Sequence, residues 1–165
     1  MNKLNLNNST KIIYNCKDYT VSQENYNLHY NKEYDMLVTQ PIPNNLENYY
    51  KSENYISHTD NNKTLIDKIY KKVRQHTLQK KIKLINSYKK SKTKSILDIG
   101  SGTGDFLKIC KDNNWTISGV EPSEKARQIA KTKDIHLSEK IEKINKQFDI
   151  ITMWHVLEHI PNLED

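Results

Sequence analysis

The sequence predicts an α/β fold for its second half, a parallel sheet with flanking helices, and three observations carry this prediction. From residue 95 onward, short apolar stretches alternate with helix-forming stretches. Three alternate glycines, in Gly100-Ser101-Gly102-Thr103-Gly104, directly follow the first apolar stretch. All four glycines lie in this half, whereas all ten tyrosines lie at or before Tyr88. Such alternation is typical of βαβ units, which bind ligands beyond the carboxyl ends of their strands.

The elements of this half can be placed in order along the chain. Strands are expected at residues 95–99, 115–120, 135–137 and 148–153. Helices are expected at residues 106–112 and 124–131, with a helical turn at 141–145. The stretch at 148–153 is apolar almost throughout, which predicts a strand buried on both faces of the sheet.

Charge also divides the chain near residue 95. Residues 1–95 carry 17 Lys and Arg against 8 Asp and Glu, a net +9, and residues 96–165 carry 9 against 12, a net −3, which together give the +6 of the chain. We therefore expect three parts: an N-terminal lid or accessory region at 1–62, a basic amphipathic helix at 63–94 and the sheet domain at 95–165. The first part is expected to be loosely ordered, with a strand at 36–38 that Pro41 and Pro43 end because proline donates no ladder hydrogen bond.

The expected helix at 63–94 has one apolar and one basic face. Apolar residues recur at three- and four-residue steps, as in Leu65, Ile66, Ile69, Tyr70, Val73, Leu78, Ile82 and Ile85. The other face carries Lys63, Lys68, Lys71, Lys72, Arg74, Lys80, Lys81 and Lys83. This face is interpreted first as a solvated surface, and alternatively as a surface for RNA.

Composition excludes several classes of protein. The apolar runs are only a few residues long, which excludes a membrane span. The start of the chain has no apolar stretch typical of a signal peptide. Cys16 and Cys110 are the only cysteines and lie far apart, which excludes a disulfide framework and a four-cysteine zinc site. We therefore expect no bound metal and a reducing, cytoplasmic location.

The glycine loop does not match the common phosphate-binding motifs. A dinucleotide fingerprint needs a third glycine where Asp105 or Leu107 stands, depending on the register, and no Gly-Lys-Ser/Thr sequence of a P-loop is present. Asp105 also puts a negative charge where a helix start would bind pyrophosphate. The loop therefore favours a ligand without phosphates there. Glu121 ends the next expected strand, where a carboxylate can accept two hydrogen bonds from a ribose diol.

These residues resemble the signature of class I S-adenosylmethionine-dependent methyltransferases, closest to the branch of small-molecule and general methyltransferases. The resemblance covers residues 95–162 and rests on Asp98–Gly104, on Glu121 and on the stretch 148–161. It implies a Rossmann-like parallel sheet with S-adenosyl-L-methionine as cofactor. The cofactor-binding residues that it implies are Asp98, Gly100, Ser101, Gly102, Gly104, Glu121, Pro122 and Trp154. Within this set, Glu121 would hold the ribose hydroxyls and Pro122 would flank the adenine.

The same resemblance gives expectations about chemistry and partners. His155 is the candidate catalytic base, needed only if the methyl acceptor carries a proton. A small-molecule acceptor is expected; the alternatives are an RNA-directed enzyme or binding module and a non-catalytic fragment of the fold. Residues 49–58 are similar to a segment that helps to cover the cofactor in bacterial relatives. The family sheet continues beyond the fourth strand, so we expect the sheet to be C-terminally incomplete, with an edge open to an oligomer contact or a partner chain.

One motif points elsewhere. The sequence His155-Val156-Leu157-Glu158-His159 matches the H-x-x-E-H pattern of some zinc proteases. Because it directly follows a buried strand and Pro161 soon ends any helix, we expect it to hold no zinc.

Overall fold

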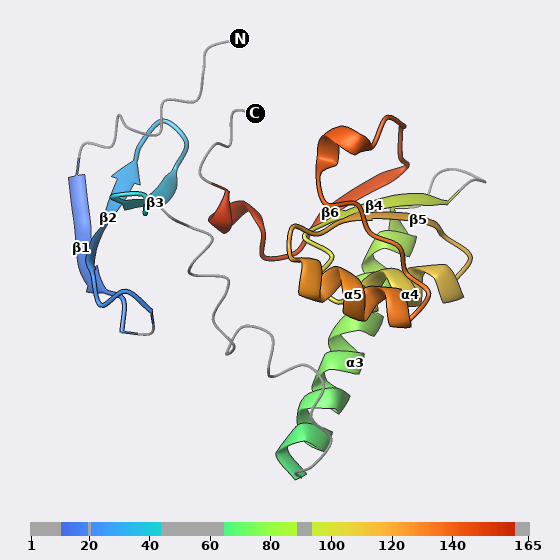
Figure 1. Cartoon of the computed structure of the whole chain (residues 1–165). Coiled ribbons are helices and arrows are strands. Elements are labelled where there is room, and N and C mark those ends of the chain that lie inside the picture. Colours follow the sequence, from blue (N-terminus) through green and yellow to red (C-terminus); the bar gives the residue numbers. More distant parts are fainter. Residues whose placement is uncertain (1–10, 20, 44–64, 89–93, 161–165) are drawn as a thin grey trace. The chain divides into compact units, whose positions relative to one another are not determined.

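The computed structural model describes residues 11–19, 21–43, 65–88 and 94–160 (Figure 1). Contacts divide the chain into two compact units. One comprises Met1–Asp60 together with Ile160–Asp165, and the other comprises Asn61–His159. No described helix is long and apolar enough to span a membrane.

The described residues of the first unit form a three-stranded antiparallel sheet in the order β1-β2-β3. Its strands are β1 (Lys11–Lys17), β2 (Asn25–Asn31) and β3 (Met36–Gln40). The expectation of loose order at 1–62 is therefore wrong for these residues. The Asn31 side chain stabilises the turn between β2 and β3, because its Oδ1 accepts hydrogen bonds from the amides of Glu33 and Tyr34 (3.0 and 3.2 Å). The expected strand at 36–38 is present as β3.

The second unit confirms the predicted α/β fold. Its parallel sheet has the order β5-β4-β6, with β4 (Ser95–Ile99) in the centre, β5 (Thr116–Val120) on one side and β6 (Ile150–Met153) on the other. The register pairs Ile99 of β4 with Val120 and with Met153. The loops that follow all three strands therefore lie at the same edge of the sheet.

In the described part of the chain, three helices support this sheet: α3 (Leu65–Ser87), α4 (Asp105–Asp112) and α5 (Glu124–Thr132). In Figure 1, α4 and α5 lie along one face of the sheet. Short 3-10 helices follow at η1 (Ile141–Lys143) and η2 (Leu157–His159). The core between helices and sheet includes Ile82, Ile85, Ile96, Phe106, Leu107, Cys110, Trp115, Ala130 and Ile135. Burial raises the pKa of the Cys110 thiol to about 12.

Two expected features of this unit are wrong. Residues 135–137 form no strand, because Ile135 turns into the core and only Ser138 reaches the sheet, through one bridge to Val120. The strand β6 is not buried on both faces, since Ile151 and Met153 are 56% and 44% exposed. Its described pairing is with β4 alone, so β6 is the edge of the described sheet.

The long helix α3 packs over only part of its length. Ile82 and Ile85 are buried and Leu78 packs against the core. Ile69 and Val73, which were expected on the packed face, are 64% and 58% exposed. Among the described residues, the apolar stripe of α3 is thus longer than the surface that covers it.

Candidate functional site

The glycine loop turns sharply at the end of β4. Gly100, Gly102 and Gly104 all have positive φ angles, of 71°, 54° and 76°. This is the left-handed region, which glycine enters without the strain that a Cβ atom brings. The amides of Gly100 and Ser101 both donate to the carbonyl of Val120 (2.8 and 3.0 Å), which fixes the loop against the end of β5.

The three glycines face different surroundings. A Cβ atom on Gly100 would lie 2.5 Å from a methyl group of Val156, and one on Gly104 would lie 3.1 Å from Ala130 and Ile135. A Cβ atom on Gly102 would have no described neighbour within 4 Å. Gly102 is therefore the glycine of the loop whose main chain faces open space, whereas the other two allow close packing within the protein.

Glu121 links the glycine loop to the end of β5. Its Oε2 accepts a hydrogen bond from the amide of Gly102 (2.8 Å), and its Oε1 accepts one from the amide of Ser123 (2.9 Å). The guanidinium of Arg127 donates to the carbonyls of Glu121 and Pro122 (2.8 and 2.6 Å). The carboxylate thus lies at the open glycine, and the turn that carries it is braced by α5. Pro122 itself is exposed.

Asp98 is the buried acid of the site. Its residue is only 2% exposed, and its Oδ1 accepts a hydrogen bond from Thr152 Oγ1 of β6 (2.7 Å). Burial raises the pKa of Asp98 to about 6, although the Thr152 hydrogen bond and the charge of Lys81 oppose this rise. Ser101 is also buried, and its Oγ donates to the Asp98 carbonyl (2.7 Å). Asp98 is therefore a carboxyl whose charge changes near neutral pH.

The start of α4 is held by ion pairs from two other elements. Asp105 pairs with Arg74 of α3 and with Lys133, which follows α5 (2.7 Å to Lys133 Nζ). The same two cations donate to Thr103, from Arg74 to its Oγ1 (3.3 Å) and from Lys133 to its carbonyl (3.1 Å). The negative charge expected at this helix start is thus present and paired within the protein.

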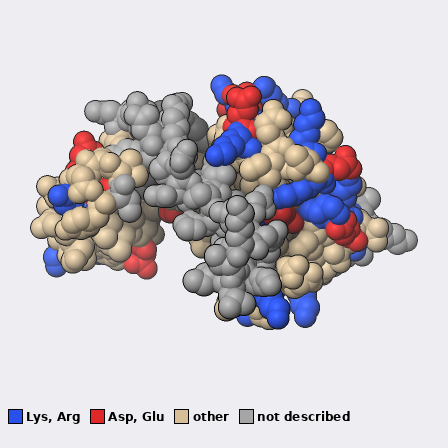
Figure 2. All heavy atoms as spheres, turned by 60° about the horizontal axis from the view of Figure 1, so that its bottom comes forward, with Lys and Arg blue, Asp and Glu red and all other residues tan. Residues whose placement is uncertain are grey.

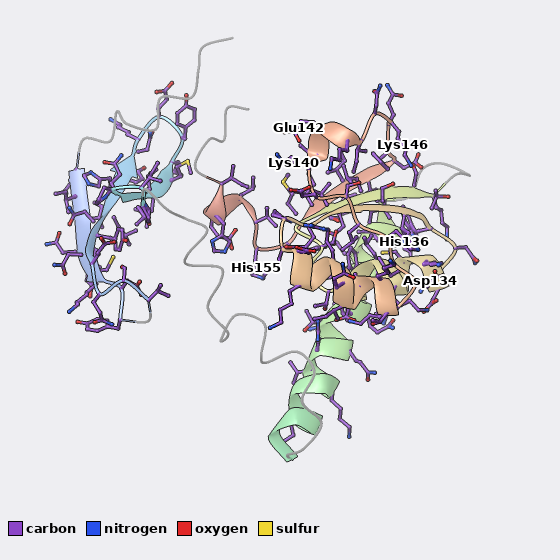
Figure 3. The ribbon with its side chains drawn as sticks, viewed as in Figure 1. Asp134, His136, Lys140, Glu142, Lys146 and His155 are labelled. Atoms are coloured by element: carbon purple, nitrogen blue, oxygen red, sulfur yellow. The ribbon has the colours of Figure 1, made fainter. Side chains whose placement is uncertain are left out.

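The segment after β6 reaches back over the glycine loop. Trp154 packs edge-to-face on Phe106 of α4, with ring centroids 5.7 Å apart, and Val156 contacts the position of Gly100. Between them, His155 has a positive φ of 57° and a side chain that is 87% exposed. Its Nδ1 lies 3.5 Å from Glu158 Oε1. Figure 3 labels His155 on this segment, between β6 and η2.

The candidate residues thus fall into two groups. The structure brings together Asp98, Gly100, Ser101, Gly102, Gly104, Glu121 and Trp154 around the end of β4. Pro122 and His155 lie at its rim, with exposed side chains. Residues 49–58, which were expected to help cover a cofactor, lie outside the described residues.

Two cations of α3 that were assigned to the solvated face point inward instead. Arg74 pairs with Asp105, and Lys81 Nζ lies 4.4 Å from the ring centroid of Trp154. Lys72, Lys80 and Lys83 are exposed as expected. Figure 2 shows basic and acidic side chains interspersed over the face in view. The basic face is therefore narrower than the sequence predicts.

Sequence reasoning missed four residues that shape this site: Arg74, Lys81, Arg127 and Thr152. Arg74 and Lys81 could not be distinguished by sequence from the other cations of α3, which were all assigned to the solvated face. For Thr152, the signal was a lone hydroxyl in an otherwise apolar strand, since a buried polar side chain needs a hydrogen-bond partner. Arg127 lies in the first turns of α5, six residues after Glu121, so its side chain can reach back to the carbonyl of Glu121.

The H-x-x-E-H pattern does not form one helical face. Only Leu157–His159 are helical, as a single 3-10 turn, and His155 precedes them with its positive φ. Within the described residues, no group of three or more His, Cys, Asp or Glu side chains could hold a metal ion.

A family model described as "Methyltransferase domain" matches residues 70–165. The chain belongs to this family. The match begins within α3 and includes the glycine loop, Glu121 and β6, so the site described above lies entirely within it.

Two curated relatives agree with this family. An uncharacterized methyltransferase of Alkaliphilus oremlandii is 32% identical over 119 residues, which is 68% of this chain and 51% of that protein. A ubiquinone biosynthesis O-methyltransferase of Thiobacillus denitrificans is 29% identical over 83 residues, 42% of this chain and 34% of that protein. The matched parts thus span about half the length of the first relative and about a third of the second.

A solved structure supports the fold. The magnesium protoporphyrin IX methyltransferase of Synechocystis PCC 6803, crystallised with S-adenosylmethionine, aligns with a TM-score of 0.57 at 15% identity. The alignment covers 74% of this chain and 67% of that chain.

Proposed function

We propose that this chain is the cofactor-binding part of an S-adenosylmethionine-dependent methyltransferase that acts on a small molecule. The observation that carries the proposal is the pairing of Gly102 with Glu121: an open glycine with positive φ whose amide binds a carboxylate from the neighbouring strand end. An open main chain suits close approach of a ligand, and the carboxylate suits a ribose diol. Family membership supplies the reaction class.

The residues present fit this cofactor. Glu121 already accepts hydrogen bonds from two amides and has further lone pairs to accept from ribose hydroxyls. Asp98 would attract the ammonium group of the methionine moiety while its carboxyl is ionised. Gly100, Ser101 and Gly104 hold the shape of the loop. Gly100 and Gly104 allow close packing, and the amides of Gly100 and Ser101 donate hydrogen bonds to Val120.

The cofactor supplies a methyl group on a sulfonium, which leaves as a neutral sulfide. The protein then has to align the acceptor with this methyl group and exclude water. Val156 lies against Gly100 of the loop and Trp154 packs on Phe106 of the helix that follows it, so both side chains would help to exclude solvent. His155 is our candidate to take the proton of an acceptor hydroxyl, because imidazole is the commonest general base and its exposed ring can meet an acceptor at the rim.

A small-molecule acceptor is favoured over RNA. The relative from Thiobacillus denitrificans is named for ubiquinone biosynthesis, which has a small-molecule product. The RNA alternative relied on the basic face of α3, and Arg74 and Lys81 of that face point inward. The edge position of β6 supports a further chain segment or partner chain that pairs there. Two free cysteines fit a cytoplasmic location.

Calorimetry with S-adenosylmethionine and S-adenosylhomocysteine tests the proposal. The unmodified chain is expected to bind both. Gly102→Val is expected to abolish binding, because its side chain would fill the open space, and Glu121→Ala is expected to weaken it by roughly tenfold or more through the lost charged hydrogen bonds.

The matched control is Glu124→Ala, which removes an exposed carboxylate in the first turn of α5 and is expected to bind as the unmodified chain does. Circular dichroism checks that each variant is folded. If the folded, unmodified chain binds neither ligand, the non-catalytic alternative is favoured. If Gly102→Val and Glu121→Ala both bind as tightly as the unmodified chain, the site is misplaced.

A further inference from the structure

Asp98 lies in the middle of a row of three residues that crosses the parallel sheet. The register pairs Asp98 with Gly119 of β5 on one side and with Thr152 of β6 on the other. Residues paired in this way lie on the same face of the sheet. This face packs on α4, since a Cβ atom on Gly119 would lie 2.5 Å from a methyl group of Leu107. Because Gly119 has no side chain, Thr152 is the neighbour in this row that can bond the carboxyl group of Asp98.

The hydroxyl of Thr152 meets this carboxyl group directly. Thr152 and Asp98 are 8% and 2% exposed, and Thr152 Oγ1 lies 2.7 Å from Asp98 Oδ1. Ser101 brings a second buried hydroxyl, but its Oγ donates to the main-chain carbonyl of Asp98 (2.7 Å). A carboxylate that is this deeply buried depends on a donor within the protein, since few water molecules can solvate it.

The same hydroxyl can bond both protonation states of Asp98. Thr152 Oγ1 also lies 3.5 Å from the carbonyl of Leu97, which is a second acceptor for its proton. A threonine hydroxyl donates one hydrogen bond and can accept others. While Asp98 is ionised, Thr152 donates to it. When Asp98 is protonated, its O–H donates to Thr152 Oγ1, and the hydroxyl of Thr152 turns to the Leu97 carbonyl.

The charged and titratable groups that face Asp98 come from three other elements. Lys81 of α3 lowers the pKa of the Asp98 carboxyl group, and Glu121 at the end of β5 raises it. The charge of Asp98 in turn helps to raise the pKa of the Cys110 thiol in α4. Among the influences that lower the pKa of Asp98, the hydrogen bond from Thr152 is the largest. Loss of that hydrogen bond therefore leaves more of Asp98 protonated near neutral pH.

We propose that Thr152 is a positioning residue, which holds the Asp98 carboxylate by a direct hydrogen bond for the ammonium group at the amino-acid end of S-adenosylmethionine. The proposal rests on the function proposed above. Thr152 acts through Asp98 and needs no contact with the ligand. Because the hydrogen bond favours the charged form of Asp98, it also sets how binding depends on pH. Strand β6 then supports cofactor binding from the face that packs on α4.

The test measures how the binding of two ligands depends on pH. S-adenosylhomocysteine carries the amino-acid end, and 5′-methylthioadenosine lacks it. The unmodified chain is expected to bind S-adenosylhomocysteine about tenfold more tightly at pH 8 than at pH 5, because Asp98 ionises between these values. Its binding of 5′-methylthioadenosine is expected to change less than about twofold, since this ligand has no ammonium group. Calorimetry measures both.

Thr152→Val removes the hydroxyl and keeps a branched side chain. It is expected to bind S-adenosylhomocysteine about fivefold more weakly than the unmodified chain at pH 6 and within about twofold at pH 8, since losing the hydrogen bond raises the pKa of Asp98 by about one pH unit. Thr152→Ser keeps the hydroxyl and is expected to restore the pH profile. The matched control, Thr116→Val, removes an exposed hydroxyl from β5 and is expected to bind as the unmodified chain does.

Carbon-13 NMR of the Asp98 carboxyl group follows its ionisation without any ligand, and Asp98→Asn assigns the signal. The midpoint is expected to rise by about one pH unit in Thr152→Val. An unchanged midpoint overturns the proposal, as do equal losses of both ligands at every pH, which would mean a structural role.

Failure of this inference can be distinguished from failure of the proposed function. If S-adenosylhomocysteine binds with the same pH profile in Thr152→Val as in the unmodified chain, this inference fails while the proposed function stands. If the midpoint of Asp98 rises in Thr152→Val but the unmodified chain binds neither ligand, the proposed function is refuted, and with it the role of Thr152 toward the cofactor.

Discussion

Each of the two sheets has three strands among the described residues, but the surroundings of the two sheets differ. In the antiparallel sheet, six of the seven residues of β1 are exposed, whereas the three central residues of β4 in the parallel sheet are buried. The helices α3, α4 and α5 supply the apolar side chains that cover β4, while Tyr26 and Asn31 are the buried residues among the described part of the other sheet. The elements that pack on a sheet, and not the number of its strands, therefore decide how far its residues are buried.

The largest effect that this comparison predicts is on core packing. Leu107 of α4 is fully buried against the parallel sheet, and Leu37 of β3 is 53% exposed. Leu107→Ala is expected to lower the free energy of unfolding by about 3 kcal/mol, and Leu37→Ala by less than about 0.5 kcal/mol. Urea denaturation measures both. Similar losses in the two variants would show that the antiparallel sheet is covered after all.

The next largest effect is expected at Asp98, because burial in the parallel sheet raises the pKa of its carboxyl. The pKa of Asp98 is about 6 in the folded chain, against 3.8 for an ordinary Asp. The folded chain therefore binds this proton more tightly, so the contribution of Asp98 to stability is fully present below pH 3.8 and is lost as the pH rises through 6.

Asp98→Asn removes this titration and keeps an acceptor for Thr152. It is expected to be more stable than the unmodified chain above pH 6, on the order of 2 kcal/mol, with the difference vanishing near pH 4. Urea denaturation of both chains at a series of pH values measures the difference between their free energies of unfolding. Other titrating groups are the same in both chains, so their contributions cancel. A difference that does not change between pH 4 and pH 7 would contradict the assigned shift.

The ion pairs that hold helices on the parallel sheet should matter less. Arg74 joins α3 to Asp105 of α4, with both side chains about three-quarters buried, whereas Lys108 and Asp112 form an exposed pair within α4. Arg74→Met is expected to lower the free energy of unfolding by about 1 kcal/mol, and Lys108→Met by less than about 0.5 kcal/mol. Thermal or urea unfolding separates them, and a larger loss for Lys108→Met would refute the cross-linking role of Arg74.

The smallest effect is expected just after β6, at an exposed side chain. The His155 side chain is 87% exposed. His155→Ala is therefore expected to change the free energy of unfolding by less than about 0.5 kcal/mol and to leave binding of S-adenosylhomocysteine unchanged. A loss above 1 kcal/mol in urea denaturation would mean that His155 packs against the site.

The sequence predicted those parts of the site in which local geometry demands particular residue types. The glycine loop and Glu121 followed from a strand, three alternate glycines and a carboxylate at the next strand end, and the structure brings Gly102 and Glu121 into contact. Strand β6 was placed correctly, but its apolar pattern could not show that the described residues leave the face with Ile151 and Met153 exposed. The roles that Asp98 and His155 would play toward a ligand stay predictions.

Tertiary contacts decided what sequence periodicity could not. The inward side chains of Arg74 and Lys81 lie among many similar cations, and only the positions of Asp105 and Trp154 distinguish them. Long amphipathic side chains can follow an apolar surface and still reach polar groups, so charge alone does not assign a helix face. The strands β1 and β2 were missed although β2 alternates Asn or His with Tyr or Leu, which is the period-two pattern of a half-buried strand.

The buried thiol in α4 has a practical consequence. Because burial raises the pKa of Cys110 to about 12, this sulfur is neither charged nor accessible in the folded chain, and alkylating reagents at neutral pH can reach it only when the core opens. The rate at which Cys110 is alkylated, followed by mass spectrometry alongside the more accessible Cys16, would therefore report how often the helix that begins at the glycine loop leaves the sheet.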